Sequence, residues 1–304
     1  MYLANSISLS DAISVYLDWK RTYTTTAYDS YKLRLGDLTA YFGEESILQE
    51  ITPIHIASFI NHLKQKPLKN GGVLSLSTVS YSIDIIRNFF DFWRGRGVSN
   101  INPKEIKRIR HVKKYKEVVT KDDFEEMIET LDERYYSDLV KKLAIHLLWD
   151  TGMRVSELCD LKLADLGGQK ENGLRSAMIR TRKTMRYNLA VWGQETNRLL
   201  NIYLGLRLDM EVAHDYLFCS RRGGSNPITR RTIERWVKDT ADQAMIDKPI
   251  SPHSFRHGKA HHMLDQGANQ RDIVAVLRHA NPVSTFHYLS LNENRFLEVA
   301  GKYL

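Results

Sequence analysis

Apolar residues recur three or four positions apart along most of this chain, and this helical spacing is the feature that most limits its fold. Thr52 followed by Pro53 is typical of a helix start, and Ser10 is a second candidate N-cap. Gly43 is suited to a helix end. Because four helices are enough for a small bundle, we expect residues 1–103 to form a helical domain. The four predicted helices lie in SLSDAISVYLDWK, TTTAYDSYKLRLGDLTAYFG, ITPIHIASFINHLKQ and LSTVSYSIDIIRNFFDFWRGRG.

The second half of the chain adds one β-hairpin to further helices. Two short runs, SAMIRT and MRYNLAV, span residues 176–181 and 185–191 and flank the tight sequence RKT, which is the one convincing strand signal in the sequence. Thr120 with Asp123 forms a possible capping box. We therefore expect a mainly α protein with a small β-sheet, in which residues 122–304 form an α+β domain. Its helices are predicted in SDLVKKLAIHLLWDTG, over 193–206, 229–246, 252–266 and 269–278, and in the final stretch NENRFLEVAGKYL.

A basic run, KEIKRIRHVKKYKEVVTK, separates the two predicted domains at residues 104–121. The whole chain has a net charge of +8 and a pI near 9.3. Nucleic acid is the leading partner for such a chain, because basic side chains release counterions from phosphate backbones. We interpret the run as a linker that lies along DNA, although a solvated linker would have the same composition. The predicted DNA contacts are Lys104, Lys107, Arg108, Arg110, Lys113, Lys114 and Lys116.

Several other classes of protein are disfavoured by composition. Cys159 and Cys219 are the two cysteines, and they lack the CxxC spacing of a disulfide framework or a thiolate metal site. No apolar run approaches the length of a membrane span. The N-terminus has neither the basic start nor the apolar core of a secretory signal. We therefore expect a cytoplasmic protein with no membrane association.

The stretch SPHSFRHGKAHHM holds four of the eleven histidines of the chain and one arginine. His253, His257 and His261 are four residues apart and would form one stripe on a helix, which could suit a metal ion. However, the stretch contains no Asp or Glu, and Arg256 would repel a cation. Arginine matches two phosphate oxygens, and histidine can move a proton near neutral pH. These residues therefore favour a phosphate site over a metal site, but one histidine and one arginine are a weak signal, and the choice depends on residues elsewhere in the chain.

Four sequence boxes occur in order between residues 150 and 290, and together they resemble the tyrosine recombinases of the phage-integrase and Xer type. TGMRVSEL resembles the TGxRxSEL box of that family, and RKTMRYNLAV resembles its hairpin box, GKGxKxRxVPL. HSFRH resembles HxLRH, and LRH resembles LGH, followed at the family spacing by a tyrosine. The resemblance assigns a catalytic set of Arg154, Lys183, His253, Arg256, His279 and the nucleophile Tyr288, supported by Glu157.

Four positions depart from the family pattern. Arg182 and Thr184 replace glycines around the hairpin lysine, and Ala190 replaces a proline. Arg278 replaces the glycine that precedes the histidine of the LGH box. None of these changes removes a catalytic group, but they leave the subfamily open.

The resemblance implies a site-specific recombinase that cuts and rejoins duplex DNA through a 3′-phosphotyrosyl intermediate, with no metal, ATP or other cofactor. It implies a helical, SAM-like core-binding domain in residues 1–103, ahead of the catalytic domain. It also implies a homo-tetramer, or a hetero-tetramer with a paralogue, assembled on DNA with inverted-repeat half-sites and associated with the nucleoid. The final predicted helix would then dock onto its own domain or onto a neighbouring protomer.

Three alternatives remain beside a simple Xer-like enzyme. An integrase or transposase of a mobile element would carry the same boxes. We expect no added arm-site domain of the kind that some phage integrases carry, because the N-terminus is short. A type IB topoisomerase shares the chemistry but does not exchange strands, and the Xer-like first domain disfavours it. The complete catalytic set disfavours a catalytically silent DNA-binding protein.

Overall fold

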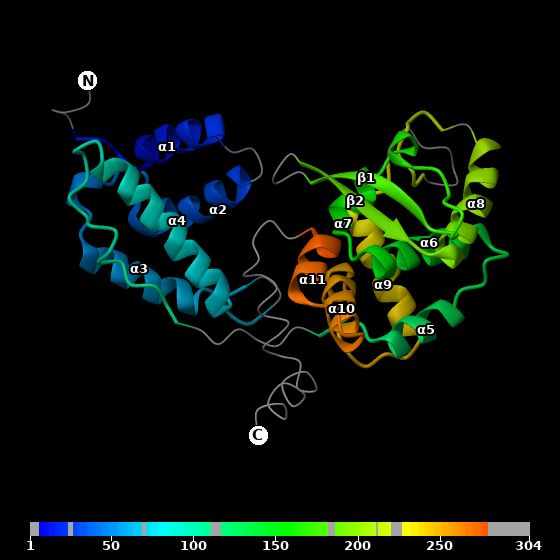
Figure 1. The fold of residues 1–304 in the computed structure, drawn as a ribbon. Coiled ribbons are helices and arrows are strands. Elements are labelled where there is room, and N and C mark those ends of the chain that lie inside the picture. Colours follow the sequence, from blue (N-terminus) through cyan, green and yellow to red (C-terminus); the bar gives the residue numbers. More distant parts are fainter. Residues whose placement is uncertain are drawn as a thin grey trace. The chain divides into compact units, whose positions relative to one another are not determined.

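The structure divides into two compact units, Met1–Lys114 and Tyr115–Leu304 (Figure 1). It is a computed structural model that describes residues 6–23, 27–68, 71–110, 117–181, 186–210, 212–219 and 227–278. Within these ranges the chain is mainly helical and has one small antiparallel sheet, which confirms the predicted fold class. None of the described helices combines the length and apolar character needed to cross a bilayer.

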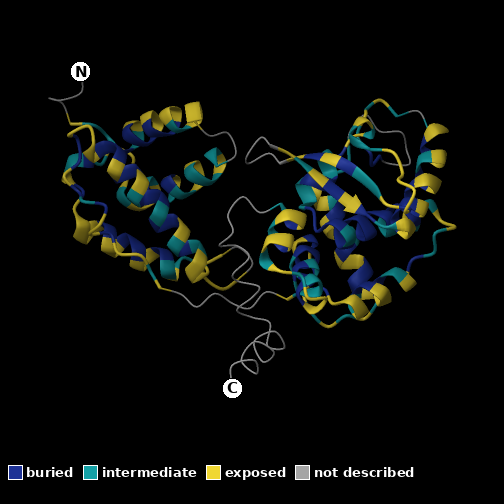
Figure 2. Ribbon diagram, viewed as in Figure 1, coloured by how far each residue is buried: buried dark blue, intermediate teal, exposed yellow. Residues whose placement is uncertain are grey.

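The first unit packs its four described α-helices around an aromatic core. Tyr16 meets the edge of Phe89 at a centroid distance of 5.4 Å, and Phe59, Phe90 and Trp93 are also buried. Figure 2 shows the buried residues on the inward sides of the helices. Burying aromatic side chains of this size is a main source of stability for a small bundle. The elements are α1 (Leu9–Tyr23), α2 (Tyr28–Phe42), the 3-10 turn η1 (Leu48–Glu50), α3 (Pro53–Gln65) and α4 (Leu76–Arg94).

Two predicted helix caps of the first unit have different outcomes. The Thr52 hydroxyl accepts the backbone N–H of His55 at 3.3 Å, and Pro53 is the first residue of α3, so this prediction is confirmed. Ser10 was wrong as the N-cap of α1. The helix starts at Leu9, two residues before the start that a Ser10 cap predicts, and the Ser8 hydroxyl accepts the backbone N–H of Asp11 at 3.1 Å.

The first part of the basic run packs on α4 of the first unit. Ile101 and Ile106 are buried in its core, and Arg87 Nη1 donates to the Ile106 carbonyl at 2.6 Å. Arg108 Nε lies 2.7 Å from Asp84 Oδ1, and both side chains are largely exposed. This segment is therefore held against the bundle by apolar burial as well as by charge.

The second unit is built around α6 (Tyr136–Thr151), most of whose residues are buried. A helix that is apolar on nearly every side must be enclosed by neighbours, and α6 packs against α8, α9, α10 and β2. The other elements are α5 (Lys121–Glu129), α7 (Val155–Asp160), the 3-10 turn η2 (Leu163–Asp165), β1 (Arg175–Thr181), β2 (Arg186–Trp192), α8 (Gln194–Leu208), α9 (Arg230–Gln243), α10 (Pro252–Asp265) and α11 (Gln270–Leu277).

The predicted hairpin is confirmed by the pairing of β1 with β2. Its register sets Met178 opposite Leu189 on the exposed face, while Ala177, Ala190 and Trp192 turn inward and are buried. This alternation is what a sheet with one covered face requires. The tip of the hairpin, residues 182–185, lies outside the described residues.

Helix boundaries in the second unit agree with the sequence in part. The capping box of α5 is confirmed, because Thr120 and Asp123 exchange hydrogen bonds. Helix α9 was predicted to reach residue 246 but ends at Gln243, and Met245 adopts a left-handed conformation with φ 54°. The six-residue α7 was not predicted as a helix. The predicted final helix lies outside the described residues.

Gly258 of α10 marks a very close approach of two backbones. A Cβ at this position would overlap the carbonyl oxygen of Val119, whose own side chain is fully buried. The Val119 N–H donates to the Ser254 carbonyl at 3.3 Å on the same helix. The segment that enters the second unit is therefore seated directly on α10, and glycine is required for that contact.

We expect Gly258→Ala to lower the free energy of unfolding by about 1–3 kcal/mol, because the added methyl group forces two backbones apart. The measurement is urea unfolding of the full chain. Gly205→Ala is the matched control, since Gly205 lies in α8 with open space around it. That substitution is expected to stabilise the protein by up to about 1 kcal/mol through helix propensity. Equal effects of the two substitutions would contradict the close approach.

Candidate catalytic site

Arg256 is a buried arginine that joins three helices of the second unit. It lies on the second turn of α10, whose start is capped by Ser251 and Pro252. Only 2% of Arg256 is exposed. Its Nη1 donates to the carbonyl of Gly152 at 2.7 Å, and its Nη2 donates to the carbonyl of Leu277. Arg256 therefore ties α10 to the ends of α6 and α11, and the two bonds fix the plane of its guanidinium.

Gly152 ends α6 in the left-handed conformation, with φ 56°, which glycine adopts readily at a helix end. A Cβ here would overlap the side chain of Leu277 at the end of α11. The preceding Thr151 hydroxyl donates to the Leu147 carbonyl and accepts the Met153 N–H. Glycine at this turn lets α11 approach closely enough for Arg256 to reach both carbonyls.

Arg154 and Glu157 follow this turn at the start of α7. Arg154 Nη1 donates to Glu157 Oε1 at 2.8 Å, and the backbone N–H of Arg154 donates to Oε2, also at 2.8 Å. The Arg154 side chain is 36% exposed, whereas that of Glu157 is 2% exposed. Glu157 therefore both caps α7 and holds the guanidinium of a partly accessible arginine.

The carboxyl of Glu157 is ionised more readily than an ordinary glutamic acid. Burial alone would raise its pKa, but the backbone hydrogen bond from Arg154 and the charges of Arg278 and Arg154 outweigh burial and lower the pKa. A buried carboxylate that stays charged gives Arg154 a permanent ionic partner.

Arg278 is the unexpected arginine of this region. It caps α11 in the left-handed conformation, with φ 56°, a conformation that costs an L-residue about 1–2 kcal/mol. Its side chain is 3% exposed, and burial lowers its pKa, opposed by the charge of Glu157. Its Nη2 donates to the Thr151 carbonyl at 3.0 Å and lies 3.8 Å from Glu157 Oε2. Its Nη1 donates to the Val276 carbonyl at 2.7 Å.

The histidines of α10 divide between one exposed residue, His253, and three that are half-buried. His253 is exposed on the first turn, and its ring lies 4.5 Å from that of His257. His262 lies 5.4 Å from the ring of Trp149, and burial lowers the pKa of His261. Across the described residues, no group of three or more His, Cys, Asp or Glu is placed to hold a metal ion. His261 and His262 thus belong to the packing of the helix, while His253 is accessible.

The structure brings together part of the predicted set. Arg154, Glu157 and Arg256 meet at the turn after α6, and His253 precedes Arg256 by one helical turn. Lys104, Lys107, Arg108 and Arg110 are exposed in the first unit. Six further predicted residues lie outside the described residues: Lys183, His279, Tyr288, Lys113, Lys114 and Lys116.

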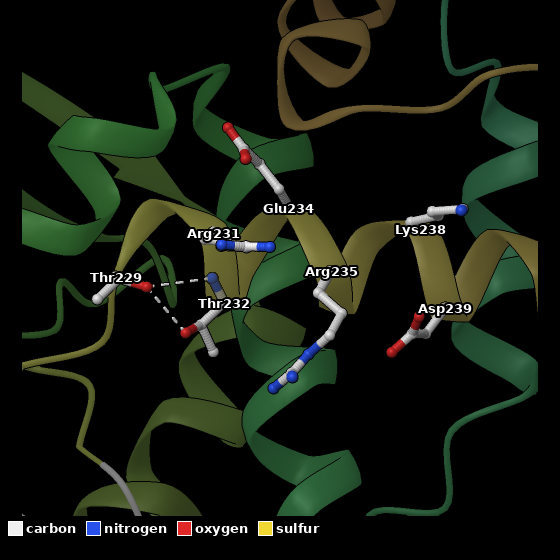
Figure 3. A pocket seen from close by; sticks show the side chains of 7 residues that line it. All are labelled: Thr229, Arg231, Thr232, Glu234, Arg235, Lys238 and Asp239. Carbon is white, nitrogen blue, oxygen red and sulfur yellow. Dashed lines mark hydrogen bonds between the residues drawn. The ribbon is translucent and has the colours of Figure 1, made fainter. Parts of the chain in front are cut away.

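A basic surface on α9 was missed by the sequence analysis. Arg231, Arg235 and Lys238 are exposed on this helix and line a groove together with the acidic Glu234 and Asp239, beginning at the N-cap residue Thr229 (Figure 3). In the part of the chain that is described, no ion pair holds any of these three basic side chains. Their i, i+4, i+7 spacing was the signal available in the sequence.

Residues 117–295 match the model of the phage integrase family. This match spans more than half of the chain, so the chain belongs to the phage integrase family. Within that family it is a Xer-like tyrosine recombinase, an enzyme that cleaves and religates DNA in site-specific recombination.

The relatives are similar along nearly the whole chain. Tyrosine recombinase XerD of Chlorobaculum tepidum is 30% identical over 93% of this chain and 92% of its own length. Tyrosine recombinase XerC of Thermodesulfovibrio yellowstonii is 29% identical over 88% of this chain and 87% of its own. These relatives favour recombination over the topoisomerase and the silent DNA-binding protein.

Two solved structures share the fold. XerH site-specific recombinase, in a post-cleavage complex with palindromic difH substrate, superposes with a TM-score of 0.74. It is 20% identical, over 97% of this chain and 84% of that chain. A lambda integrase dimer bound to a core site also gives 0.74, at 15% identity over 95% and 96% of the two chains. At these identities the likeness concerns the fold alone.

The lowered pKa of Glu157 predicts how the stability of the protein depends on pH. A carboxylate with a lowered folded-state pKa contributes stability above its ordinary value of 4.5, and loses it as the pH falls through the folded value. At about pH 7 we expect Glu157→Gln to cost about 3 kcal/mol, because two arginines lose their buried partner. The difference in the free energy of unfolding between Glu157→Gln and wild type should become smaller as the pH falls below about 4.5.

Urea unfolding of the full chain at a series of pH values measures this difference. Glu129→Gln is the matched control, because Glu129 is exposed at the end of α5. The control should stay within about 0.5 kcal/mol of wild type throughout. A Glu157→Gln cost that is small at neutral pH, or constant with pH, would contradict the buried ionic role.

Proposed function

We propose that the turn after α6 is the phosphate-binding centre of a metal-free strand transfer. Arg154 and Arg256 neutralise the non-bridging oxygens of the scissile phosphate, and Glu157 orients Arg154. Arginine has five N–H donors, so the two carbonyl bonds of Arg256 are compatible with a phosphate contact. The observation that carries the proposal is the convergence of these two arginines on one turn, fixed by a buried carboxylate and two backbone carbonyls.

The reaction itself is a balanced transesterification. The phenol oxygen of Tyr288 attacks phosphorus after His253 accepts its proton, and the bond from phosphorus to the 5′ oxygen breaks. Lys183 gives a proton to the leaving 5′ oxygen, which becomes a 5′-hydroxyl, and His279 adds a hydrogen bond to the phosphate. The 3′-phosphotyrosyl bond conserves the energy of the phosphodiester, so rejoining needs only the reverse attack by a 5′-hydroxyl. These roles come from the family boxes and use only side chains of this chain and DNA.

We propose that the two units have different roles in binding DNA. Residues 1–103 act as the helical core-binding domain, residues 104–121 as a basic linker on the phosphate backbone, and residues 122–304 as the catalytic domain. The α9 surface of Arg231, Arg235 and Lys238 is a second surface that binds duplex DNA, and it lies on the catalytic domain. The exposure of these three residues and of Lys104 and Lys107 supports these roles.

We also propose a tetramer on two duplexes with inverted-repeat half-sites, acting as a simple Xer-like recombinase at the nucleoid. The relatives named XerC and XerD support this role over a mobile-element integrase. Lambda integrase, which shares the fold, has been solved as a tetramer on a Holliday junction, which supports a multimeric assembly. The tetramer consists of this chain alone or of this chain with a paralogue.

The covalent step is tested by trapping. We expect wild-type protein, incubated with fragmented host DNA in EDTA and then denatured, to stay attached to one inverted-repeat sequence. Tyr288→Phe should bind the same DNA with unchanged affinity and form no adduct, because it lacks the phenol oxygen. Sequencing of the attached DNA identifies the recombination site. Adducts formed by the Phe variant would overturn the nucleophile, and adducts that require a divalent metal would overturn the metal-free mechanism.

The role of the α9 surface is tested by the salt dependence of DNA binding. Arg235→Ala should weaken binding about equally for all sequences and reduce the slope of log K against log salt by about one, because one phosphate contact is lost. Arg134→Ala is the matched control, since the exposed Arg134 is already neutralised by Asp132 at 2.6 Å. Fluorescence anisotropy with a duplex probe measures both. Equal slopes for wild type and Arg235→Ala would remove α9 from the interface.

A further inference from the structure

Arg278 occupies a conformation that an arginine would ordinarily avoid. Among the described residues, Met245 and Arg278 are the non-glycine residues with positive φ. Met245 lies on the surface, and 89% of it is exposed. Arg278 instead directs its side chain inward, where 3% of it is exposed. A strained backbone combined with a buried charge persists only where surrounding contacts compensate for both.

Those contacts join Arg278 to Thr151, just before the proposed phosphate-binding turn, and to Glu157, just after it. Its Nη2 donates to the carbonyl of Thr151, the residue before Gly152. The same nitrogen lies 3.8 Å from Glu157 Oε2, while Oε1 of that carboxylate accepts a hydrogen bond from Arg154. Glu157 thus stands between two arginines, one partly exposed and one buried. Any shift of Arg278 changes the field and the packing that hold Glu157.

Arg278 also reinforces the junction made by Arg256. Arg256 donates to the Leu277 carbonyl from α10, and Arg278, the next residue, donates back to the end of α6. Arg256 therefore joins the ends of α6 and α11 from α10, and Arg278 joins the end of α11 to the end of α6 directly.

We propose that Arg278 is a positioning residue for DNA cleavage: by holding Glu157 and the Thr151 carbonyl it aligns Arg154. This inference rests on the proposed function. Arg278 acts through its neighbours, because its side chain is enclosed and its Nη atoms already donate to two backbone carbonyls. The glycine of the family pattern cannot supply this link, so the alignment is a property of this chain.

The test uses the duplex that gives the strongest Tyr288 adduct in the trapping experiment, with wild type, Arg278→Gly and Arg278→Asn. Glycine and asparagine both accept a left-handed backbone, so the fold is kept while the side-chain link is lost. We expect the single-turnover rate of adduct formation at saturating protein to fall about 10- to 100-fold, because small misplacements of catalytic groups are costly. DNA affinity should stay within about twofold, because Arg278 does not contact DNA. Arg278→Lys keeps the charge beside Glu157 and should recover part of the rate.

A pH profile separates positioning from a general loss of structure. Among the described residues, the charged side chains that face Glu157 include Arg154, from the start of α7, and Arg278, from the end of α11. Removing Arg278 removes one influence that lowers the pKa of Glu157, so its pKa rises and the carboxylate is protonated at higher pH. The acid limb of the cleavage rate should therefore move to higher pH in Arg278→Gly. In a Glu157→Gln background the same change should leave the acid limb unmoved and alter the rate less than it does in wild type.

Each outcome is decisive. If Arg278→Gly and Arg278→Asn both cleave DNA at the wild-type rate, with an unmoved acid limb, the inference is overturned. The proposed function stands in that case, because the adduct still forms. A loss that appears in DNA affinity shows direct contact with DNA and overturns a positioning role. A slower Arg278→Gly enzyme with an equal loss in the Glu157→Gln background overturns the link through Glu157. A wild-type protein that forms no adduct contradicts the proposed function itself.

Discussion

The guanidinium of Arg256 reaches two backbone carbonyls that belong to different helices, and the arrangement of the second unit depends on that contact. The carbonyls of Gly152 and Leu277 end α6 and α11, where helices leave such groups without an intrahelical partner. A charged donor satisfies both and is itself enclosed without an unpaired charge facing apolar groups. One side chain thereby fixes its own orientation and the spacing of the three helices around it.

Close backbone contacts then hold α10 on two sides. Gly152 permits the end of α11 to approach the turn, and Gly258 permits the segment around Val119 to lie directly on α10. A side chain at Gly152 would separate the ends of α6 and α11, whose distance sets the reach of Arg256, and one at Gly258 would push the segment around Val119 away from α10. Rigid packing of this kind suits the phosphate-binding role that we propose for Arg256, because an electrostatic contribution to catalysis is largest when the donor need not reorganise during the reaction.

The sequence predicted helices well where apolar spacing and caps agreed, as at Thr52 and Thr120, and the hairpin because strand alternation appears there. It missed α7, which is too short to show a period and is capped by a carboxylate reaching back to a backbone N–H. The site was predicted through residue boxes that name side chains. The backbone carbonyls that bind Arg256 cannot be predicted in this way, because every residue has a backbone carbonyl. Only the folded chain shows which two of them Arg256 contacts.

The same region concentrates positive charge around one buried carboxylate. Arg154, Arg256 and Arg278 converge on the turn after α6, and Glu157 is the acidic group that pairs with two of them. Burial lowers the pKa of Arg278, the charge of Glu157 opposes that lowering, and the charge of Arg154 adds to it. In the function that we propose, a phosphodiester supplies a further anion to these cations, and its charge grows towards the transition state. On that proposal the positive charge of the turn favours cleavage, and the backbone carbonyls and Glu157 hold the arginines in place before DNA binds.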